Sequence, residues 1–438
     1  MKPNKLFPDS GYASPLLSYQ TLYVLMFFCM LWSLCYLRPF YDGYGDTPSY
    51  FNAWLHLKEF RPDGARTPVY SLVITAFRVL FGLEAGGMMT AIFQWLVFFV
   101  AVNYFRKSLL LLGVGLRGSF LATAVFALCP GVFHYNICYI TESLAVSGMI
   151  FFMYFIIRLG KAPEVRDIYL AAVTLTFLVF LRPAFIYLLP LTALYAGVLW
   201  LRFRREAVRT VRAGLISLAV VVGLYAGYGV AVNRCYGLHT ISYISVYNNL
   251  YLIREAKLMT PSSATTPAIR EIIETNVTDG ESVDFQSIER EIRPFFELDL
   301  AEQERYADSV AGSNKTALLK YLLLSRFNQF SKYPALICYI PGSDHRSGEC
   351  RMSAAYIPIQ TFLWFAVIYA VWLCVYCRKR REIPVVSMML LAVSMGLAAV
   401  VFVGAMGDWS RLMAPALPSI ALMGAQLFSQ FRFVGKFL

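Results

Sequence analysis

Residues 384–405 read PVVSMMLLAVSMGLAAVVFVGA, a run that contains no Asp, Glu, Lys, Arg or His. A helix rises about 1.5 Å per residue, so this run is long enough to cross a hydrocarbon core about 30 Å thick. The run therefore predicts a transmembrane helix.

Similar apolar runs recur through most of the chain. The composition agrees with this pattern, because 58% of the residues are hydrophobic and 15% are charged. A soluble domain is roughly a quarter charged, so an ordinary soluble protein is excluded. We predict an all-α polytopic membrane protein with about ten transmembrane helices, at residues 22–37, 88–104, 119–132, 143–158, 167–181, 184–201, 213–232, 356–376, 384–405 and 412–430.

The apolar segment 68–82 is short for a span and carries Arg78 in its middle. Cytoplasmic loops typically hold an excess of Lys and Arg. The four short basic loops lie on the same side as the two termini only if residues 68–82 do not cross the membrane. We therefore expect 68–82 to be an interfacial helix, with both termini cytoplasmic. The basic loops are residues 106–117, 158–166, 202–212 and 378–381.

This topology divides the chain into three regions. Residues 1–232 hold seven spans and a first outer loop, 38–87; residues 233–355 form a large outer loop; residues 356–438 hold the last three spans. Most of the net charge of +12 follows from the basic loops, so no nucleic-acid partner is needed to explain it. In the large loop, residues 267–330 show helical spacing of apolar side chains, and its stretch 317–330 could lie on the membrane.

Cysteine and histidine residues give little sign of a cofactor. Cys235, Cys338 and Cys350 fall on the outer side, where one disulfide could form. The four histidines are scattered and make no metal cluster, and no Walker loop or dinucleotide motif is present. No cofactor is therefore predicted with certainty, and a role for a divalent metal ion is left open.

Ionisable residues gather at the predicted outer face, whereas the spans are nearly free of acids. Such groups at membrane depth are costly, so a converging set indicates a functional site. The set consists of Asp42, Asp46, Arg66, Glu142, Arg182, Asp408 and Arg411.

The acids of this set also have structural interpretations. Asp46 could cap an interfacial helix that has Pro48 in its first turn. Asp42 suits a turn beside Gly43. Glu142 could complement the positive end of a helix dipole behind a Thr141 cap.

Arg182 and Arg411 are harder to explain structurally. Each lies near the start of a predicted span, where the helix dipole disfavours a cation. A phosphate group suits both, because helix N-termini and guanidinium groups bind its oxygens. The alternative is a salt bridge of Arg411 to Asp408, or of Arg182 to Glu142.

Several short motifs, taken in order, resemble the glycosyltransferase C superfamily. The bacterial branch similar to protein O-mannosyltransferases and lipid A aminoarabinose transferases is the nearest in pattern. The resemblance covers about residues 20–235 and 356–430. The motifs are Asp46-Thr-Pro-Ser-Tyr50, Arg66-Thr-Pro68-Val-Tyr70, Cys129-Pro-Gly-Val-Phe-His-Tyr135, Ile140-Thr-Glu142, Leu181-Arg-Pro183 and Ser410-Arg-Leu-Met-Ala-Pro415.

The chain also departs from the family pattern. Thr47 follows Asp46, where many relatives carry a second acid, and this weakens the case for a metal at that point. Ser71 follows Tyr70, where a proline is usual. The loop 233–355 aligns with nothing in the family.

The resemblance implies that a sugar moves from a polyprenyl-phosphate carrier to a lipid, glycan or protein acceptor, with inversion at the anomeric carbon. Asp46 would be the general base. Arg182 and Arg411 would hold the lipid phosphate, and Glu142 would bind the sugar or orient an arginine. Tyr50 or Tyr70 would stack on a sugar face, and Arg66 and Asp408 would complete the substrate site. The expected location is the bacterial inner membrane, with the site on the periplasmic face.

The sequence is also compatible with two other functions. An envelope polysaccharide polymerase or ligase would depend on arginines of the large outer loop rather than on an acid of the first loop. A transporter or lipid flippase would place its key groups near the membrane midplane, often on broken helices in related halves. The charges at one face argue against transport.

Overall fold

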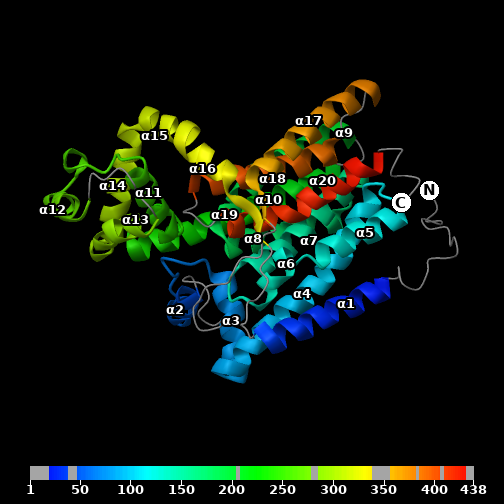
Figure 1. Cartoon of the computed structure of the whole chain (residues 1–438), viewed down its shortest axis with the longest axis horizontal. Helices are drawn as coiled ribbons and strands as arrows, with labels where there is room; N and C mark the ends of the chain where they lie inside the picture. The colour runs from blue at the N-terminus through cyan, green and yellow to red at the C-terminus, as the bar shows by residue number, and fades with distance from the viewer. Residues whose placement is uncertain are drawn as a thin grey trace.

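The computed structural model describes residues 19–37, 47–203, 208–277, 285–337, 356–380, 384–404 and 409–430. Almost all regular elements in this part of the chain are helices (Figure 1). The chain is thus an all-α polytopic membrane protein, as its apolar runs predict.

Seven helical segments of the described residues are long and apolar enough to cross a membrane. A bent pair, α5 (Leu116–Ala127) with α6 (Pro130–Phe133) and η3 (His134–Ile137), turns by 57° and would make an eighth. The seven are α4 (Leu83–Leu111), α7 (Glu142–Lys161), η4 (Pro183–Tyr187) with α9 (Leu188–Phe203), α10 (Val208–Tyr236), α17 (Ile359–Arg380), α18 (Val385–Gly404), and α19 (Trp409–Met413) with η8 (Ala414–Ala416) and α20 (Leu417–Gln430).

Two further predicted spans are shorter helices. These are α1 (Tyr19–Trp32) with η2 (Ser33–Leu37), and α8 (Val165–Leu181). A span needs about 20 residues, with a lower limit near 17. The expected total of about ten spans therefore stays a prediction.

Helix α7 forms the centre of the helical bundle. It packs against α4, α8, α18 and α20, and nearly its whole length is buried. An all-round apolar helix is typical of such a buried position.

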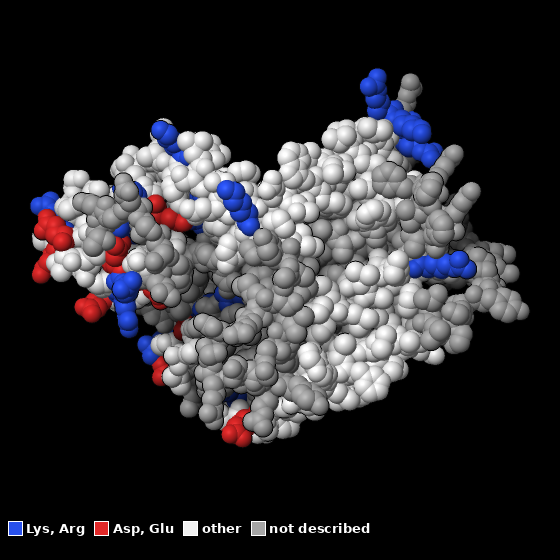
Figure 2. Space-filling view, viewed as in Figure 1, with Lys and Arg blue, Asp and Glu red and all other residues white. Residues whose placement is uncertain are grey.

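The bundle has two chemically different ends. The start of α1 lies beside the end of α4 and the start of α5, since the Tyr19 hydroxyl is 3.1 Å from Ser119 Oγ and the Arg106 guanidinium lies 3.6 Å from the centre of the Tyr19 ring. At this end, called the basic end here, α17 finishes with Arg378, Lys379 and Arg380. Figure 2 shows a broad uncharged surface between the blue side chains at its right and the mixed red and blue side chains at its left.

The segment predicted to be interfacial is α3 (Pro68–Phe81), which follows α2 (Thr47–Lys58). Gly82, with φ +81°, ends α3 and lets α4 begin at once. The two helices meet closely at Gly86, where an added Cβ would lie 2.6 Å from Arg78 Cα. Helix α3 thus folds back beside α4, and this arrangement is consistent with a segment that does not cross the membrane.

The first part of the large loop, residues 238–313, folds into a group of short helices that we call the helical cap (Figure 1, left). It has a hydrophobic core of its own, which includes Ile269, Ile273, Ile288 and Ile292 from the predicted helical pattern. Its elements are α11 (Tyr243–Glu255), η5 (Pro261–Ser263), α12 (Pro267–Asn276), α13 (Phe285–Ile292), η6 (Arg293–Glu297) and α14 (Leu300–Ser313).

The chain returns from the cap to the bundle through α15 (Lys315–Tyr321), η7 (Leu322–Arg326) and α16 (Phe327–Lys332). Leu319, Leu323 and Leu324 are exposed on this segment, as suits the expectation that residues 317–330 lie on the membrane. Two short strands, β1 (Pro334–Ile337) and β2 (Tyr356–Pro358), then pair antiparallel, with Leu336 opposite Ile357. The sequence pattern did not predict them.

The predicted disulfide falls partly outside the described residues. Cys235 is exposed near the end of α10, whereas Cys338 and Cys350 are among the residues that are not described. The pairing stays a prediction.

Candidate functional site

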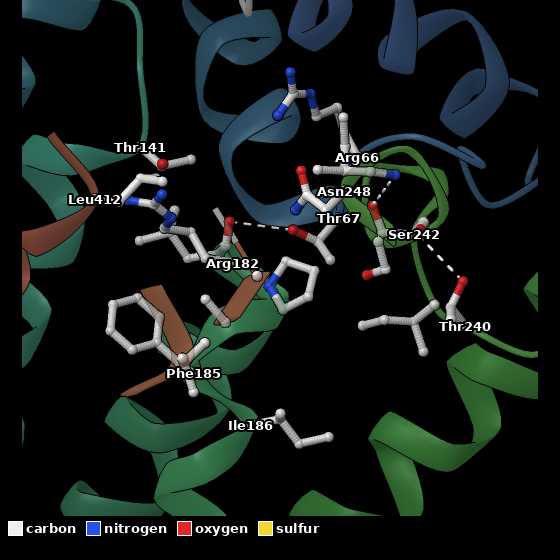
Figure 3. A pocket seen from close by; sticks show the side chains of 18 of the residues that line it. Arg66, Thr67, Thr141, Arg182, Phe185, Ile186, Thr240, Ser242, Asn248 and Leu412 are labelled. Atoms are coloured by element: carbon white, nitrogen blue, oxygen red, sulfur yellow. Dashed lines mark hydrogen bonds between the residues drawn. The ribbon is translucent and has the colours of Figure 1, made fainter. Parts of the chain in front are cut away.

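A cavity of about 520 Å³ lies between the bundle and the helical cap, at the end opposite the basic end (Figure 3). Its lining comes from the first outer loop, the start of α7, the junction of α8 and η4, the end of α18, the α19 region and the first turns of α11. Cavities that bind small ligands measure roughly 300–1,000 Å³, so this one suits a small organic molecule.

Glu142 and two arginines form the centre of the charged lining. Glu142 Oε1 accepts a hydrogen bond from Arg182 Nη1 at 3.1 Å and lies 3.3 Å from Arg411 Nε. The Glu142 side chain is 2% exposed, and each arginine side chain is 14% exposed. The salt bridge of Arg182 to Glu142, which was the structural alternative to a phosphate site, is thus present, and Arg411 contacts the same carboxylate.

Local structure explains why these residues meet. Glu142 is the first residue of α7, behind Thr141. Thr141 occupies the N-cap position but its side chain makes no capping hydrogen bond, whereas Glu142 does lie in the first turn, where it complements the helix dipole as expected. Arg182 is extended because Pro183 follows it, and this ends α8 and turns the guanidinium toward Glu142.

The cluster has surplus positive charge. Two guanidinium groups share one carboxylate, and Arg66 also lines the cavity. Among the described lining residues, Glu142 is the one acid. Guanidinium groups bind phosphate and carboxylate oxygens through charge-assisted hydrogen bonds, so the cavity is suited to an anion.

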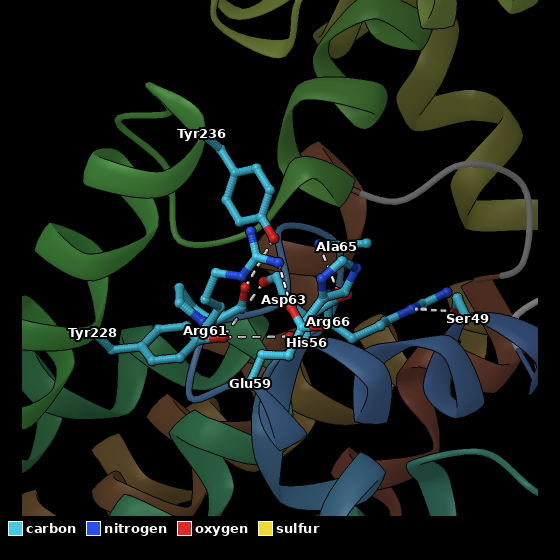
Figure 4. A network of polar contacts seen from close by, with 10 residues as sticks. Ser49, His56, Glu59, Arg61, Asp63, Ala65, Arg66, Tyr228 and Tyr236 are labelled. Carbon is cyan, nitrogen blue, oxygen red and sulfur yellow. Dashed lines mark hydrogen bonds and ion pairs between the residues drawn. The ribbon is translucent and has the colours of Figure 1, made fainter.

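Arg66 is held by other residues of the first outer loop (Figure 4). Its Nε donates to Ser49 Oγ at 2.6 Å, and its guanidinium lies 4.6 Å from the centre of the Tyr50 ring. Asp63 Oδ1 accepts the backbone N–H groups of Ala65 and Arg66, at 2.8 and 2.6 Å. Asp63 therefore fixes the turn that places Arg66, a role that the sequence analysis missed.

Tyr50 and Tyr70 differ in their positions. Tyr50 lines the cavity, whereas Tyr70 is fully buried behind it, with ring centres 4.9 Å apart. The Tyr70 hydroxyl donates to Gln94 Oε1 at 3.1 Å. Tyr70 thus supports Tyr50, and the expected sugar-stacking role does not fit its buried position.

Asp46 and Asp408 lie outside the described residues. Asp46 directly precedes α2, and Asp408 directly precedes α19. Their predicted roles, Asp46 as the general base and Asp408 in the substrate site, stay predictions. Asp42 and the predicted turn around it also lie outside the described residues.

The part of the lining that comes from the helical cap was not predicted from the sequence. His239, Thr240, Ser242, Ser245, Tyr247 and Asn248 line the cavity. Tyr243, Tyr247 and Tyr251 recur there every four residues, a spacing that is typical of a packing stripe on a helix. Tyr243 and Tyr247 do pack against Phe296, but Tyr247 also reaches the cavity.

Burial raises the pKa of Tyr247 to about 12, with a smaller contribution from the negative charge of Glu289. The hydroxyl, like that of an ordinary tyrosine, is protonated at neutral pH and is able to donate a hydrogen bond.

A comparison with protein-family models found no match for this chain, and a comparison with curated proteins found none. The geometry of the cavity therefore carries the functional argument.

Proposed function

We propose that this protein is a membrane glycosyltransferase that moves a sugar from a polyprenyl-phosphate carrier to an acceptor hydroxyl, with inversion. The observation that carries the proposal is the cavity, in which Arg66, Arg182 and Arg411 outnumber Glu142 at one end of an apolar bundle. A lipid-linked phosphate needs such an anion site beside an apolar surface.

In the proposed reaction, the acceptor oxygen attacks the anomeric carbon of the donor sugar. The bond from that carbon to the phosphate oxygen breaks, and polyprenyl phosphate leaves with the electron pair. Arg182 and Arg411 stabilise the charge that grows on the leaving phosphate. The Asp46 carboxylate takes the acceptor proton as the new bond forms.

Glu142 orients the two arginines in this mechanism. Its carboxylate holds Arg182 and Arg411 on the same side of the cavity before substrate binds. Pre-organised charges cost little reorganisation during the reaction. We therefore assign Glu142 a positioning role.

The proposed setting is the bacterial inner membrane. The basic end would face the cytoplasm, because Lys and Arg are enriched in cytoplasmic loops. The cavity, at the other end, would then face the periplasm.

The lining supports this function over an envelope polysaccharide polymerase or ligase. Such an enzyme would be expected to use arginines of the large outer loop. Among the described arginines of residues 233–355, none lines the cavity, and Arg254 and Arg326 are buried in ion pairs with Glu291 and Glu255.

The test is transfer of labelled sugar by membranes charged with polyprenyl-phosphate sugars. Wild type and Asp46→Asn are compared at matched expression, with Arg305→Gln on the exposed surface of α14 as a control. The proposal expects transfer by wild type and by the control, and a loss of about 100-fold or more in Asp46→Asn, as is typical when a general base is removed. Transfer by Asp46→Asn at the wild-type rate would remove Asp46 from the mechanism.

A further inference from the structure

The cavity has two walls of different chemistry (Figure 3). In this view Arg182 lies on the side of Thr141 and Leu412, whereas Thr240 and Ser242 lie on the opposite side. The first wall carries the paired charges. The second, from the helical cap, has no Asp, Glu, Lys or Arg and combines the apolar side chains Ile241 and Ile244 with polar groups, among them the hydroxyl and amide groups of Ser245 and Asn248. A glycosyl phosphate has the same division, since its phosphate is anionic and its sugar is neutral and rich in hydroxyl groups.

Two side chains of the second wall are open for hydrogen bonding. Ser245 and Asn248 lie on the first two turns of α11, line the cavity and are half-buried. Within the part of the chain that the structure describes, neither side chain hydrogen-bonds to another protein group. An Asn amide offers both donors and an acceptor, and a Ser hydroxyl offers one donor and acceptor sites, which match the hydroxyl groups of a sugar.

The second wall is also firmly placed. The backbone N–H groups of His239 and Thr240 donate to the buried Glu304 carboxylate, at 2.6 and 2.9 Å. Ser242, the N-cap of α11, donates its hydroxyl to the Ala65 carbonyl at 2.6 Å. The Ser242 bond ties the start of α11 to the segment that carries Arg66, and the Glu304 bonds hold the residues before α11 against α14.

We propose that Ser245 and Asn248 bind the hydroxyl groups of the transferred sugar and determine which sugar-carrying lipid is accepted. This inference rests on the proposed function. The arginines supply affinity for the phosphate of any carrier, whereas the α11 wall supplies the preference for the sugar. A site built to hydrogen-bond hydroxyl groups discriminates strongly, because its polar groups are left unpaired by the wrong ligand.

The test uses the full-length protein in nanodiscs and measures Kd for two kinds of probe. One probe is polyprenyl phosphate without a sugar, and the other is a panel of polyprenyl-phosphate monosaccharides that differ in hydroxyl configuration. The variants are Asn248→Ala and Ser245→Ala. The matched control is Asn249→Ala, because Asn249 lies on the same helix but does not line the cavity.

Wild type should bind one glycosyl lipid at least tenfold more tightly than polyprenyl phosphate. Asn248→Ala should lose most of that preference and keep the wild-type Kd for polyprenyl phosphate, which also shows that the variant is folded. Asn249→Ala should behave as wild type.

Three results would overturn the inference. The first is equal binding of glycosyl and sugar-free lipids by wild type, and the second is an unchanged preference in both Asn248→Ala and Ser245→Ala. Either would overturn the sugar-binding role of Ser245 and Asn248 and leave the proposed function standing. The third is that wild type binds neither kind of lipid, and this would overturn the proposed function as well.

Discussion

At the scale of single residues, Glu142 is the point on which the charged cluster depends. It is almost fully buried and contacts Arg182 and Arg411 through the same oxygen. The positive charge of two neighbouring guanidinium groups offsets the cost of burying a charged carboxylate. The carboxylate in turn partly neutralises each guanidinium. Removing the carboxylate leaves two like charges side by side.

We predict that Glu142→Gln destabilises the ligand-free protein by about 3 kcal/mol, the usual cost of removing one partner of a buried ion pair. Added polyprenyl phosphate should restore more stability to this variant than to wild type, because the lipid anion replaces the missing charge. The measurement is the thermal unfolding midpoint in nanodiscs with and without the lipid. Glu274→Gln, at an exposed position on α12, is the control. Equal restoration in Glu142→Gln and wild type would contradict the prediction.

At the scale of elements, Arg326 connects the helical cap to the bundle. Its Nη1 pairs with Glu255 at the end of α11, and its Nε donates to the Phe402 carbonyl of α18 at 2.8 Å. Its guanidinium also lies 5.6 Å from the centre of the Trp409 ring, at the start of α19. Arg411 follows Trp409 by two residues, so Arg326 supports one edge of the site through Trp409.

A double-mutant cycle of Arg326→Met and Glu255→Gln tests this connection. Each single change should lower stability, by about 3 kcal/mol for Arg326→Met, because each leaves a buried partner unpaired. The double change should cost at least about 1 kcal/mol less than the sum, since neither partner is then left alone. The measurement is again the thermal midpoint, and Arg61→Gln, in an exposed ion pair with Glu59, should cause no detectable shift. Additive effects of the two changes would show that the pair does not act as a unit.

At the scale of the whole molecule, the apolar runs predicted the class of the protein and the approximate position of most helices. Periodic or continuous apolar patterns are local, so one sequence reveals them. The convergence of Glu142, Arg182 and Arg411 was also predicted, because a fixed topology places the start of α7, the end of α8 and the α19 region at one end.

The α11 wall and the role of Asp63 could not be predicted in the same way. Ser242 donates a hydrogen bond to the Ala65 carbonyl, and Glu304 accepts hydrogen bonds from the His239 and Thr240 amides. These bonds use backbone groups that any residue provides. Such long-range contacts leave no periodic pattern in the sequence. The predicted sugar-stacking role of Tyr70 does not fit for a related reason, since the burial of Tyr70 depends on the packing of α3 against α4.

The central claim is that the cavity is an anion site for a lipid-linked phosphate, and one measurement tests it most directly. Binding of radiolabelled polyprenyl phosphate is measured for purified wild type, for the double variant Arg182→Gln with Arg411→Gln, and for the control Arg305→Gln. Each charged hydrogen bond contributes roughly 1.5–3 kcal/mol, so we expect a loss of affinity of about 100-fold or more in the double variant and none in the control. Binding by the double variant as tight as by wild type would contradict the account.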